Sequence, residues 1–184
     1  MQINDYEARH GITDENFKDT QIGSDAVGAT SATNDDVIST LNNLIETCKD
    51  GQFGFQQAAE GVQRSDLKTV FYEFSQQRGK FAGELQALVR DLGGEPENSS
   101  SVAAALHRGW INIKAVVTGH DDEAILNECE RGEDVAKDHY KKAAQMNLPA
   151  NVMQIVQSQY QAVQAAHDQV KALRNASSNT ARTS

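Results

Sequence analysis

Apolar side chains recur every three or four positions through four long stretches of this chain, which are separated by short polar breaks. This spacing puts the apolar side chains along one face of an α-helix, and it predicts helices over about residues 35–64, 66–92, 121–146 and 149–174. Since each helix needs a partner for its apolar face, the four helices are expected to pack around one core, as a single bundle over residues 35–174.

The residues at the ends of these stretches are typical of helix starts and stops. Asn34 or Asp35 is expected to cap the first helix, because a short polar side chain can accept the free N–H groups there. Gly93 and Gly94 end the second helix, and Pro149 suits the first turn of the fourth.

The lengths of the connections predict how the helices are ordered. The first and second helices, and likewise the third and fourth, are joined too closely to be anything but antiparallel neighbours. About 28 residues separate the second helix from the third, and a further helix over about 101–117 would be about 24 Å long, enough to return along the bundle. The sequence therefore predicts an all-α, ferritin-like antiparallel four-helix bundle with a long helical crossover between its second and third helices.

Two terminal segments flank the predicted bundle. Residues 1–34 hold isolated apolar side chains without a sustained period, so they predict a flexible N-terminal arm. The alternative is an arm that docks on a neighbouring subunit through Tyr6, Phe17 and Ile22. Residues 175–184 contain no large apolar side chain and are expected to form a disordered tail.

One long polar residue interrupts the apolar face of each predicted helix near its middle, at Gln52, Arg78, Glu133 and Gln159. Counting residues from the turns places the first two at about the same height and the last two level to within about one helical turn. Because an unpaired buried charge costs several kcal/mol, Arg78 and Glu133 are expected to form a buried ion pair, with the two glutamines beside it. If the apolar frame drifts along the helices, one or two of these residues point to solvent instead.

Several combinations of residues resemble a bacterial family of ferritin-like four-helix proteins that is catalogued as a domain of unknown function. They lie within about residues 35–174 and are Leu41-Asn42-Asn43-Leu44-Ile45-Glu46, Asp50-Gly51, Gly54-Phe55, Ala58-Ala59-Glu60, Arg78 with Glu84-Leu85, His107-Arg108-Gly109-Trp110, Cys129-Glu130-Arg131-Gly132-Glu133-Asp134 and Ala165-Ala166-His167-Asp168. The resemblance implies a ferritin-like bundle in proteins often associated with bacterial stress responses. It implies no established catalytic activity.

The predicted helices lack the ligand pattern of a di-iron ferritin-like site. Such a site takes a Glu from each of two helices and a Glu-x-x-His from each of the other two, and none of the four helices contains a Glu-x-x-His pair. Arg78 would also place a permanent positive charge where a metal would lie. No metal, no cofactor and no catalytic residue is therefore expected, and the alternative is a single weaker iron site formed by Glu130, Glu133 and His167.

Charge and composition narrow the classes of partner. The net charge of -9 makes nucleic acid and anionic membrane surfaces unfavourable partners, because both are negatively charged. No apolar run approaches the length of a membrane span, and the first residues lack the features of a signal peptide, so a cytoplasmic location is expected.

The missing ligand set, the expected ion pair and the N-terminal arm favour a non-enzymatic ferritin-like bundle that acts by binding or self-assembly in bacterial stress physiology. A homo-oligomer is expected, with the arm as one route to it. The alternative is a metal-dependent iron oxidase or iron-handling protein with a degenerate ferritin-like site.

Overall fold

A computed structural model describes residues 32–98, 110 and 112–182. Within these residues the chain forms five helices and no strand, which confirms the prediction of an all-helical protein. The helices are α1 (Asn34–Gly61), α2 (Ser65–Asp91), α4 (Ile113–Gly119), α5 (Asp122–Ala144) and α6 (Ala150–Arg182). None of these helices is long and apolar enough to span a membrane.

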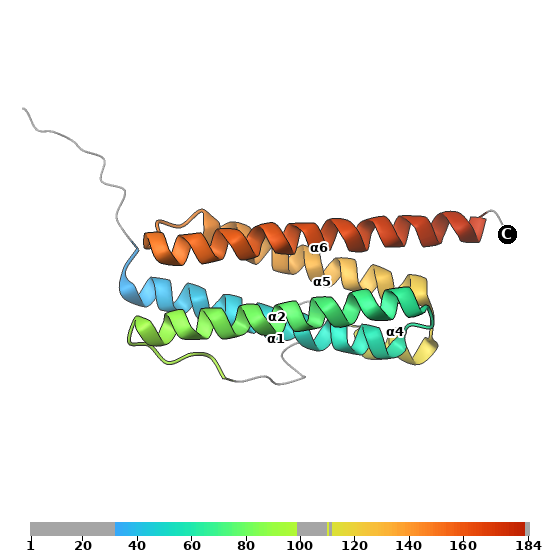
Figure 1. Ribbon diagram of the computed structural model, residues 1–184, viewed down its shortest axis with the longest axis horizontal. Coiled ribbons are helices and arrows are strands. Elements are labelled where there is room, and N and C mark those ends of the chain that lie inside the picture. Colours follow the sequence, from blue (N-terminus) through green and yellow to red (C-terminus); the bar gives the residue numbers. More distant parts are fainter. Residues whose placement is uncertain (1–31, 99–109, 111, 183–184) are drawn as a thin grey trace, which may run out of the picture.

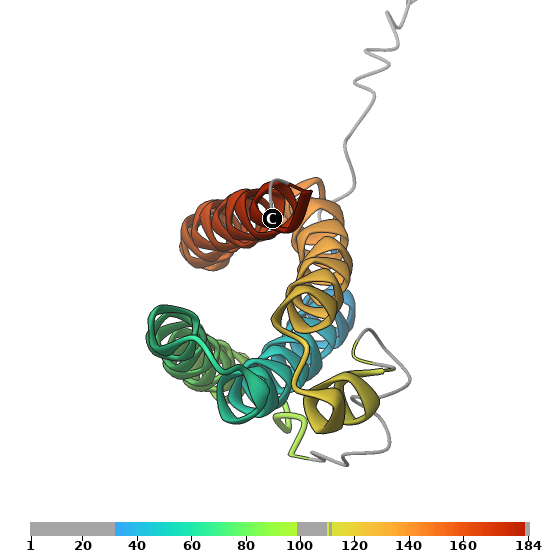
Figure 2. The same ribbon diagram turned by 90° about the vertical axis from the view of Figure 1, so that its right-hand side faces the viewer.

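Four of the helices are long and lie lengthwise beside one another, while α4 is short (Figure 1). α1 and α6 run in one direction, and α2 and α5 run in the other (Figure 1). α1 packs along both α2 and α5, and α5 packs along α6, so that the end-on view in Figure 2 shows an open ring. The ring is open where α2 faces α6, because these two helices approach each other at few points.

α1 begins with a capping box, but not at the predicted residue. The Thr33 hydroxyl accepts the Asp36 backbone N–H at 3.2 Å, and the Asp36 carboxylate accepts the Thr33 backbone N–H at 3.2 Å. The predicted caps, Asn34 and Asp35, are the first residues of the helix instead. A cap at Asn34 would have Val37 at the third helical position, which cannot return a hydrogen bond, whereas Thr33 and Asp36 satisfy two N–H groups together.

The turn between α1 and α2 is held by the start of α5. The Asp122 carboxylate accepts the backbone N–H groups of Gln63 at 2.8 Å and of Arg64 at 3.2 Å, just before α2. Asp121 caps α5 by accepting two further backbone N–H groups. Because Asp121 and Asp122 adjoin, the starts of α2 and α5 are fixed at the same end of the molecule.

α6 ends later than the sequence predicts, because it stays helical to Arg182 rather than stopping at residue 174. The Ser178 hydroxyl donates to Glu123 of α5 at 2.8 Å. Arg64 donates to the Ser177 hydroxyl at 3.1 Å. The apolar pattern does not predict this extension, because the last turns of α6 are held by polar contacts with the starts of α2 and α5.

Two other predicted segments lie largely outside the described residues. The arm over residues 1–34 is described only from Ala32. The crossover helix expected over 101–117 is described only at residue 110 and from residue 112, and α4 begins at Ile113.

Trp110 fits into a notch between α1 and α5. A Cβ on Gly54 of α1 would lie 2.0 Å from the indole ring, and a Cβ on Gly132 of α5 would lie 2.6 Å from it. The ring also meets Phe55 edge-on, with the ring centres 5.1 Å apart. The two glycines therefore let the indole pack directly against both helix backbones.

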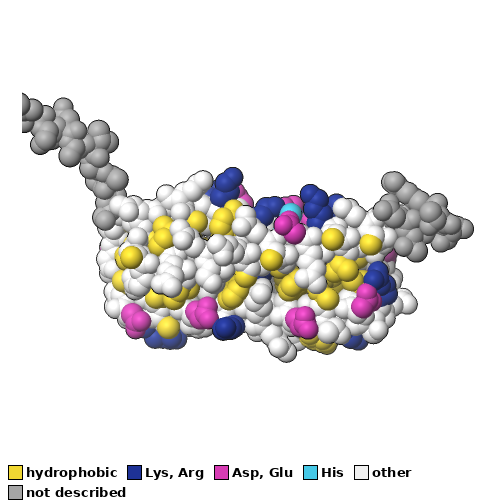
Figure 3. Space-filling view, turned by 45° about the horizontal axis from the view of Figure 1, so that its top comes forward, with side chains coloured by type: hydrophobic (Ala, Val, Ile, Leu, Met, Phe, Trp, Pro, Cys, Tyr) yellow, Lys and Arg dark blue, Asp and Glu magenta, His cyan; other side chains and the backbone are white. Residues whose placement is uncertain are grey.

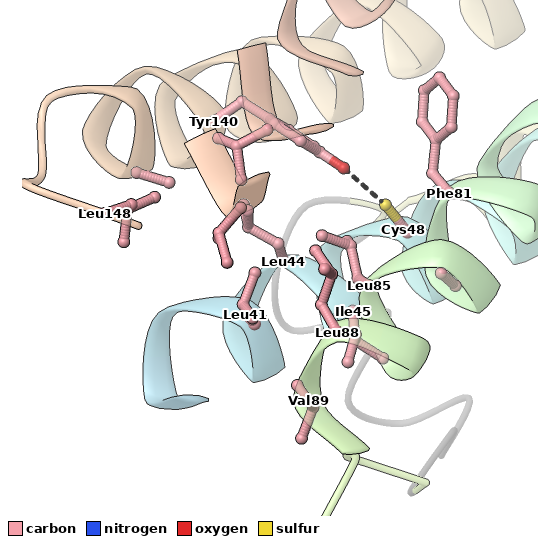
Figure 4. Close-up of a cluster of buried hydrophobic side chains, with 14 of the residues drawn as sticks. Leu41, Leu44, Ile45, Cys48, Phe81, Leu85, Leu88, Val89, Tyr140 and Leu148 are labelled. Atoms are coloured by element: carbon pink, nitrogen blue, oxygen red, sulfur yellow. Dashed lines mark hydrogen bonds between the residues drawn. The ribbon is translucent and has the colours of Figure 1, made fainter. Parts of the chain in front are cut away.

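The buried apolar side chains form two clusters, one toward each end of the bundle, and Figure 4 shows part of the first. The change from one cluster to the other falls near the middle of each helix, between Cys48 and Phe55, between Phe74 and Phe81, and between Cys129 and Ala136. Polar side chains occupy the level where the two clusters meet.

Candidate functional site

Arg78 of α2 and Glu133 of α5 form a buried ion pair where the two apolar clusters meet. Arg78 Nη2 donates to Glu133 Oε2 at 2.6 Å, and both side chains are only 1% exposed. Arg78 Nη1 donates to Gln77 Oε1 at 2.8 Å. The structure thus brings together the two charged residues that the sequence placed in the core.

The surroundings of Arg78 suit a large cation. The carbon at the centre of its guanidinium lies 6.0 Å from the ring centre of Phe55 and 5.7 Å from that of Phe81. Aromatic faces attract a cation, most strongly where water is excluded. Gly51 of α1 leaves room for the arginine, because a Cβ there would lie 3.2 Å from Arg78 Cγ. The small residue at position 51 therefore lets α1 approach the arginine side chain closely.

Burial raises the pKa of Glu133, and the neighbouring Arg78 guanidinium opposes this rise because it favours the carboxylate. Glu133 Oε1 and Arg78 Nε are also buried, and neither has a hydrogen-bond partner among the described residues. The pair is therefore incompletely satisfied. Its net stabilisation is expected to be small, even though removing one partner alone would cost much more.

A second set of polar contacts links all four long helices next to the ion pair. Cys48 Sγ of α1 lies 3.0 Å from Tyr140 Oη of α5, as the dashed line in Figure 4 shows. The Tyr140 hydroxyl donates to Gln159 Oε1 of α6 at 2.7 Å, so the Cys48 thiol is the donor in the first contact. Gln159 Nε2 donates to Glu84 Oε2 of α2 at 2.8 Å. This chain of hydrogen bonds fixes the heights of the four helices relative to one another.

Burial suppresses acid–base chemistry in this second set. It raises the pKa of Cys48 to about 11, and it raises the pKa of Tyr140 well above its usual value. Burial likewise raises the pKa of Cys129 well above its usual value. Both cysteines are free and buried. Since the thiolate is the nucleophilic form, neither cysteine is set up as a nucleophile at neutral pH.

Gln52 does not belong to the layer, contrary to the prediction. Its side chain is exposed, whereas Gly51 and Phe55 of the same helix face the core. A frame of seven-residue repeats drifts against a straight helix of 3.6 residues per turn, and this drift moves the core-facing position from Gln52 to Gly51. Gln52 instead lies over Gly79 of α2, where a Cβ would be 3.0 Å from its Nε2.

Gln159 is buried as expected, with 2% exposure, but its partners are Tyr140 and Glu84 rather than the ion pair. The sequence reasoning missed both partners. Tyr140 continues an apolar row of its helix, which by itself indicates only core packing, although a buried tyrosine hydroxyl usually needs a hydrogen-bond partner. The hydrophobic pattern does not single out Glu84 as a core residue, because Glu84 lies at the partly exposed edge of α2.

The residues that a ferritin-like metal site would need do not fit a metal here. Glu133 is paired with Arg78, and Glu130 Oε2 lies 2.7 Å from Arg174 Nη1. Among the described residues, no group of three or more His, Cys, Asp and Glu side chains comes together in a way that could hold a metal ion. The alternative set of Glu130, Glu133 and His167 is therefore not brought together.

His167 is engaged by charged neighbours. Its Nδ1 lies 3.0 Å from Asp168 Oδ1. Its Nε2 lies 3.1 Å from the Lys137 ammonium and 3.0 Å from Asp134 Oδ1. Both ring nitrogens of His167 therefore have protein partners, and neither points toward Glu130 or Glu133 in a shared site.

Comparisons with known proteins concern the family and the fold. The sequence model of a family described as "Domain of unknown function (DUF2383)" matches residues 36–146. The fold is similar to a crystal structure of a two-domain protein from Anabaena variabilis that contains DJ-1/ThiJ/PfpI-like and ferritin-like domains. The TM-score is 0.67 at 13% sequence identity, and the match covers 82% of this chain and 39% of that one. No curated protein matches the sequence.

Proposed function

Because this chain belongs to the family described as "Domain of unknown function (DUF2383)" and has a ferritin-like fold, we propose that it is a non-enzymatic ferritin-like bundle that acts by binding or self-assembly. Both findings agree with the resemblance that the sequence suggested. The 13% identity to the Anabaena variabilis protein carries the fold alone, so the proposal rests on this chain's own residues.

The observation that carries the proposal is the ion pair of Arg78 and Glu133. A ferritin-like metal centre needs acidic and imidazole ligands that converge with free lone pairs. In this chain the buried carboxylate faces a permanent cation 2.6 Å away. The imidazole of His167 faces Lys137, and Glu130 faces Arg174. The buried carboxylate is thus already paired with a permanent protein cation, which supports a bundle without a metal centre.

We also propose the finer architecture as a four-helix bundle with a long crossover between α2 and α5. The parallel directions of α2 and α5 in Figure 1 support it, since a chain that leaves the end of α2 must return along the bundle before α5 can start. A cytoplasmic location, self-assembly and a role in bacterial stress physiology belong to the same proposal.

Anaerobic Fe(II) titration with elemental analysis tests the main proposal. The whole chain and a Glu130→Gln variant are expected to bind less than one tightly held iron per chain, with no difference between them. Stoichiometric binding that the Glu130→Gln change abolishes would overturn the proposal in favour of an iron-handling protein.

Light scattering of the full chain over a range of concentrations tests self-assembly separately. A mass above that of one chain supports it. A mass of one chain at every concentration would restrict the proposal to the binding of other partners.

A further inference from the structure

The first half of α6 presents a helix surface without charged side chains. Residues 150–166 contain no Asp, Glu, Lys or Arg, although 23% of the whole chain is charged. At that average, a stretch of this length would hold about four charged residues. Where α6 begins, at the left of Figure 3, the surface is white and yellow. The missing charges therefore distinguish this face from the rest of an acidic surface.

The outer side of this half of α6 is not covered by the described residues. α6 packs along α5 and approaches α2 at few points. Gln154, Gln157, Ser158 and Gln161 are exposed, and their spacing of three and four residues places them on one side of the helix, where they form the amide row. The four residues line an open hollow of about 600 Å³. The amide row is thus accessible to another molecule.

The glutamines of the amide row are not used within the described part of the chain. Gln154, Gln157 and Gln161 form no side-chain hydrogen bond there, whereas the side chains of Gln56 and Gln57 on α1 both donate to Glu60. Each glutamine amide can donate through its NH₂ group and accept through its oxygen. The row therefore offers donors and acceptors at successive turns of the helix.

A row of this kind is complementary to itself. In a two-fold interface, residues near the axis meet the same residues, or close neighbours, of the other copy. A charged side chain there would meet a like charge, whereas an amide can both donate to and accept from another amide. Two copies with a net charge of -9 repel each other, and the amide row is a face that adds no charge to this repulsion. These properties favour a second copy of the chain as the partner.

The surroundings of the amide row resemble those of an interface. Met153 and Tyr160 lie beside the row and are partly exposed. Interface centres are depleted of charged residues and enriched in tyrosine and methionine, and their rims are polar. Next to Tyr160, a groove between α5 and α6 carries charges of both signs, including Lys137, Asp138 and Lys141. The face therefore has a neutral centre with a charged edge.

The size of the face indicates how tightly it can hold a partner. Residues 150–166 span about 26 Å of a helix about 10 Å wide, so the face offers about 260 Å² in outline. A stable interface between two folded proteins buries about 800 Å² on each partner, and smaller interfaces belong to weak complexes. An association through this face is therefore expected to be reversible.

We infer that two copies of the chain associate reversibly through the amide rows of α6, packed antiparallel about a two-fold axis near Gln157 and Ser158. Gln154 of one copy then lies opposite Gln161 of the other. The antiparallel arrangement also opposes the helix dipoles and keeps the charged second half of α6 outside the overlap. The inference rests on the proposed function in one respect, since it names the surface through which self-assembly occurs.

Sedimentation equilibrium of the full chain, with charges of either sign introduced at position 157, tests the inference. The wild type is expected to shift from the mass of one chain toward that of two as its concentration rises. Gln157→Glu and Gln157→Lys each place like charges near the axis, so each should weaken dimerisation about tenfold or more. An equimolar mixture of the two variants brings opposite charges together and should restore the dimer. A mixture that associates no better than either variant alone would overturn the inference.

A matched pair of variants controls for net charge. Gln76→Glu and Gln76→Lys make the same changes at an exposed position of α2 and should leave dimerisation unchanged. Circular dichroism checks that all four variants fold. Self-association that neither change at position 157 weakens would overturn the inference but leave the proposed self-assembly standing. A wild type with the mass of one chain at every concentration would overturn both, and the iron titration is independent of either result.

Discussion

Replacing Arg78 by leucine should destabilise the protein strongly, because Glu133 then stays buried without its cation. Both side chains are 1% exposed, and Glu133 Oε1 already has no hydrogen-bond partner among the described residues. Breaking one side of such a pair costs about 3 to 5 kcal/mol. Urea denaturation of wild type and Arg78→Leu, followed by circular dichroism at neutral pH, measures this difference.

The loss should shrink as the pH falls. Without Arg78 the main influences that oppose the burial of Glu133 are lost and its pKa rises further, so the variant takes up a proton when it folds. A carboxyl group whose pKa is higher in the folded than in the unfolded state stabilises the fold most below its unfolded pKa, and this contribution is lost as the pH rises through the folded pKa. At about 1.4 kcal/mol per pH unit, lowering the pH from about 7 to about 5 should recover up to about 2.7 kcal/mol of the difference from wild type.

Two control variants separate the pair from its surroundings. Glu133→Gln should lose a similar amount at pH 7, and position 133 should contribute no pH dependence to the stability of this variant, because glutamine does not titrate and the guanidinium of Arg78 stays charged. The double change Arg78→Met with Glu133→Leu should be far milder, since no unpaired charge remains. Equal losses in the single and double variants, or a loss in Arg78→Leu that does not change with pH, would refute the reasoning.

Three further predictions concern packing, burial and capping. Gly54→Ala should cost about 1 to 3 kcal/mol and shift the emission of the single tryptophan, Trp110, to longer wavelength, because the new Cβ would lie 2.0 Å from the ring. Gly83→Ala, where a Cβ meets nothing within 4 Å, should instead stabilise the fold by about 0.5 to 1 kcal/mol in urea denaturation. Cys48, with its pKa raised to about 11, should not react with Ellman's reagent at pH 8 until the protein is unfolded, and a fast reaction of the folded protein would contradict its burial. Thr33→Ala should lower the free energy of unfolding by about 1 kcal/mol through loss of the capping box, and an unchanged urea midpoint would contradict that role.

The helices could be predicted from the sequence because the signal that specifies them is local. Apolar residues three and four apart define a helix face whatever packs against it. The same pattern marked Arg78 and Glu133 as interruptions of that face, and the cost of an unpaired buried charge made each the expected partner of the other.

Only the tertiary structure decided which of two adjacent residues on a helix faces the core. Gln52 and Gly51 are adjacent in the chain, and the close approach of α1 to Arg78 gives the core position to the glycine. Tyr140 contacts Cys48, and Gln159 contacts Glu84, because the four helices are aligned along the bundle so that these side chains lie at the same level. Such heights depend on long-range contacts that no single helix contains.

The sequence by itself therefore determined the four long amphipathic helices and the two opposite charges in their core. Only the tertiary structure decided the ends of the helices, the chain of hydrogen bonds between them and the opening along α2 and α6. The physical reason is that periodicity fixes a face within one helix. The rotation of that face, and how closely it approaches another helix, depend on the whole set of side chains that pack between them.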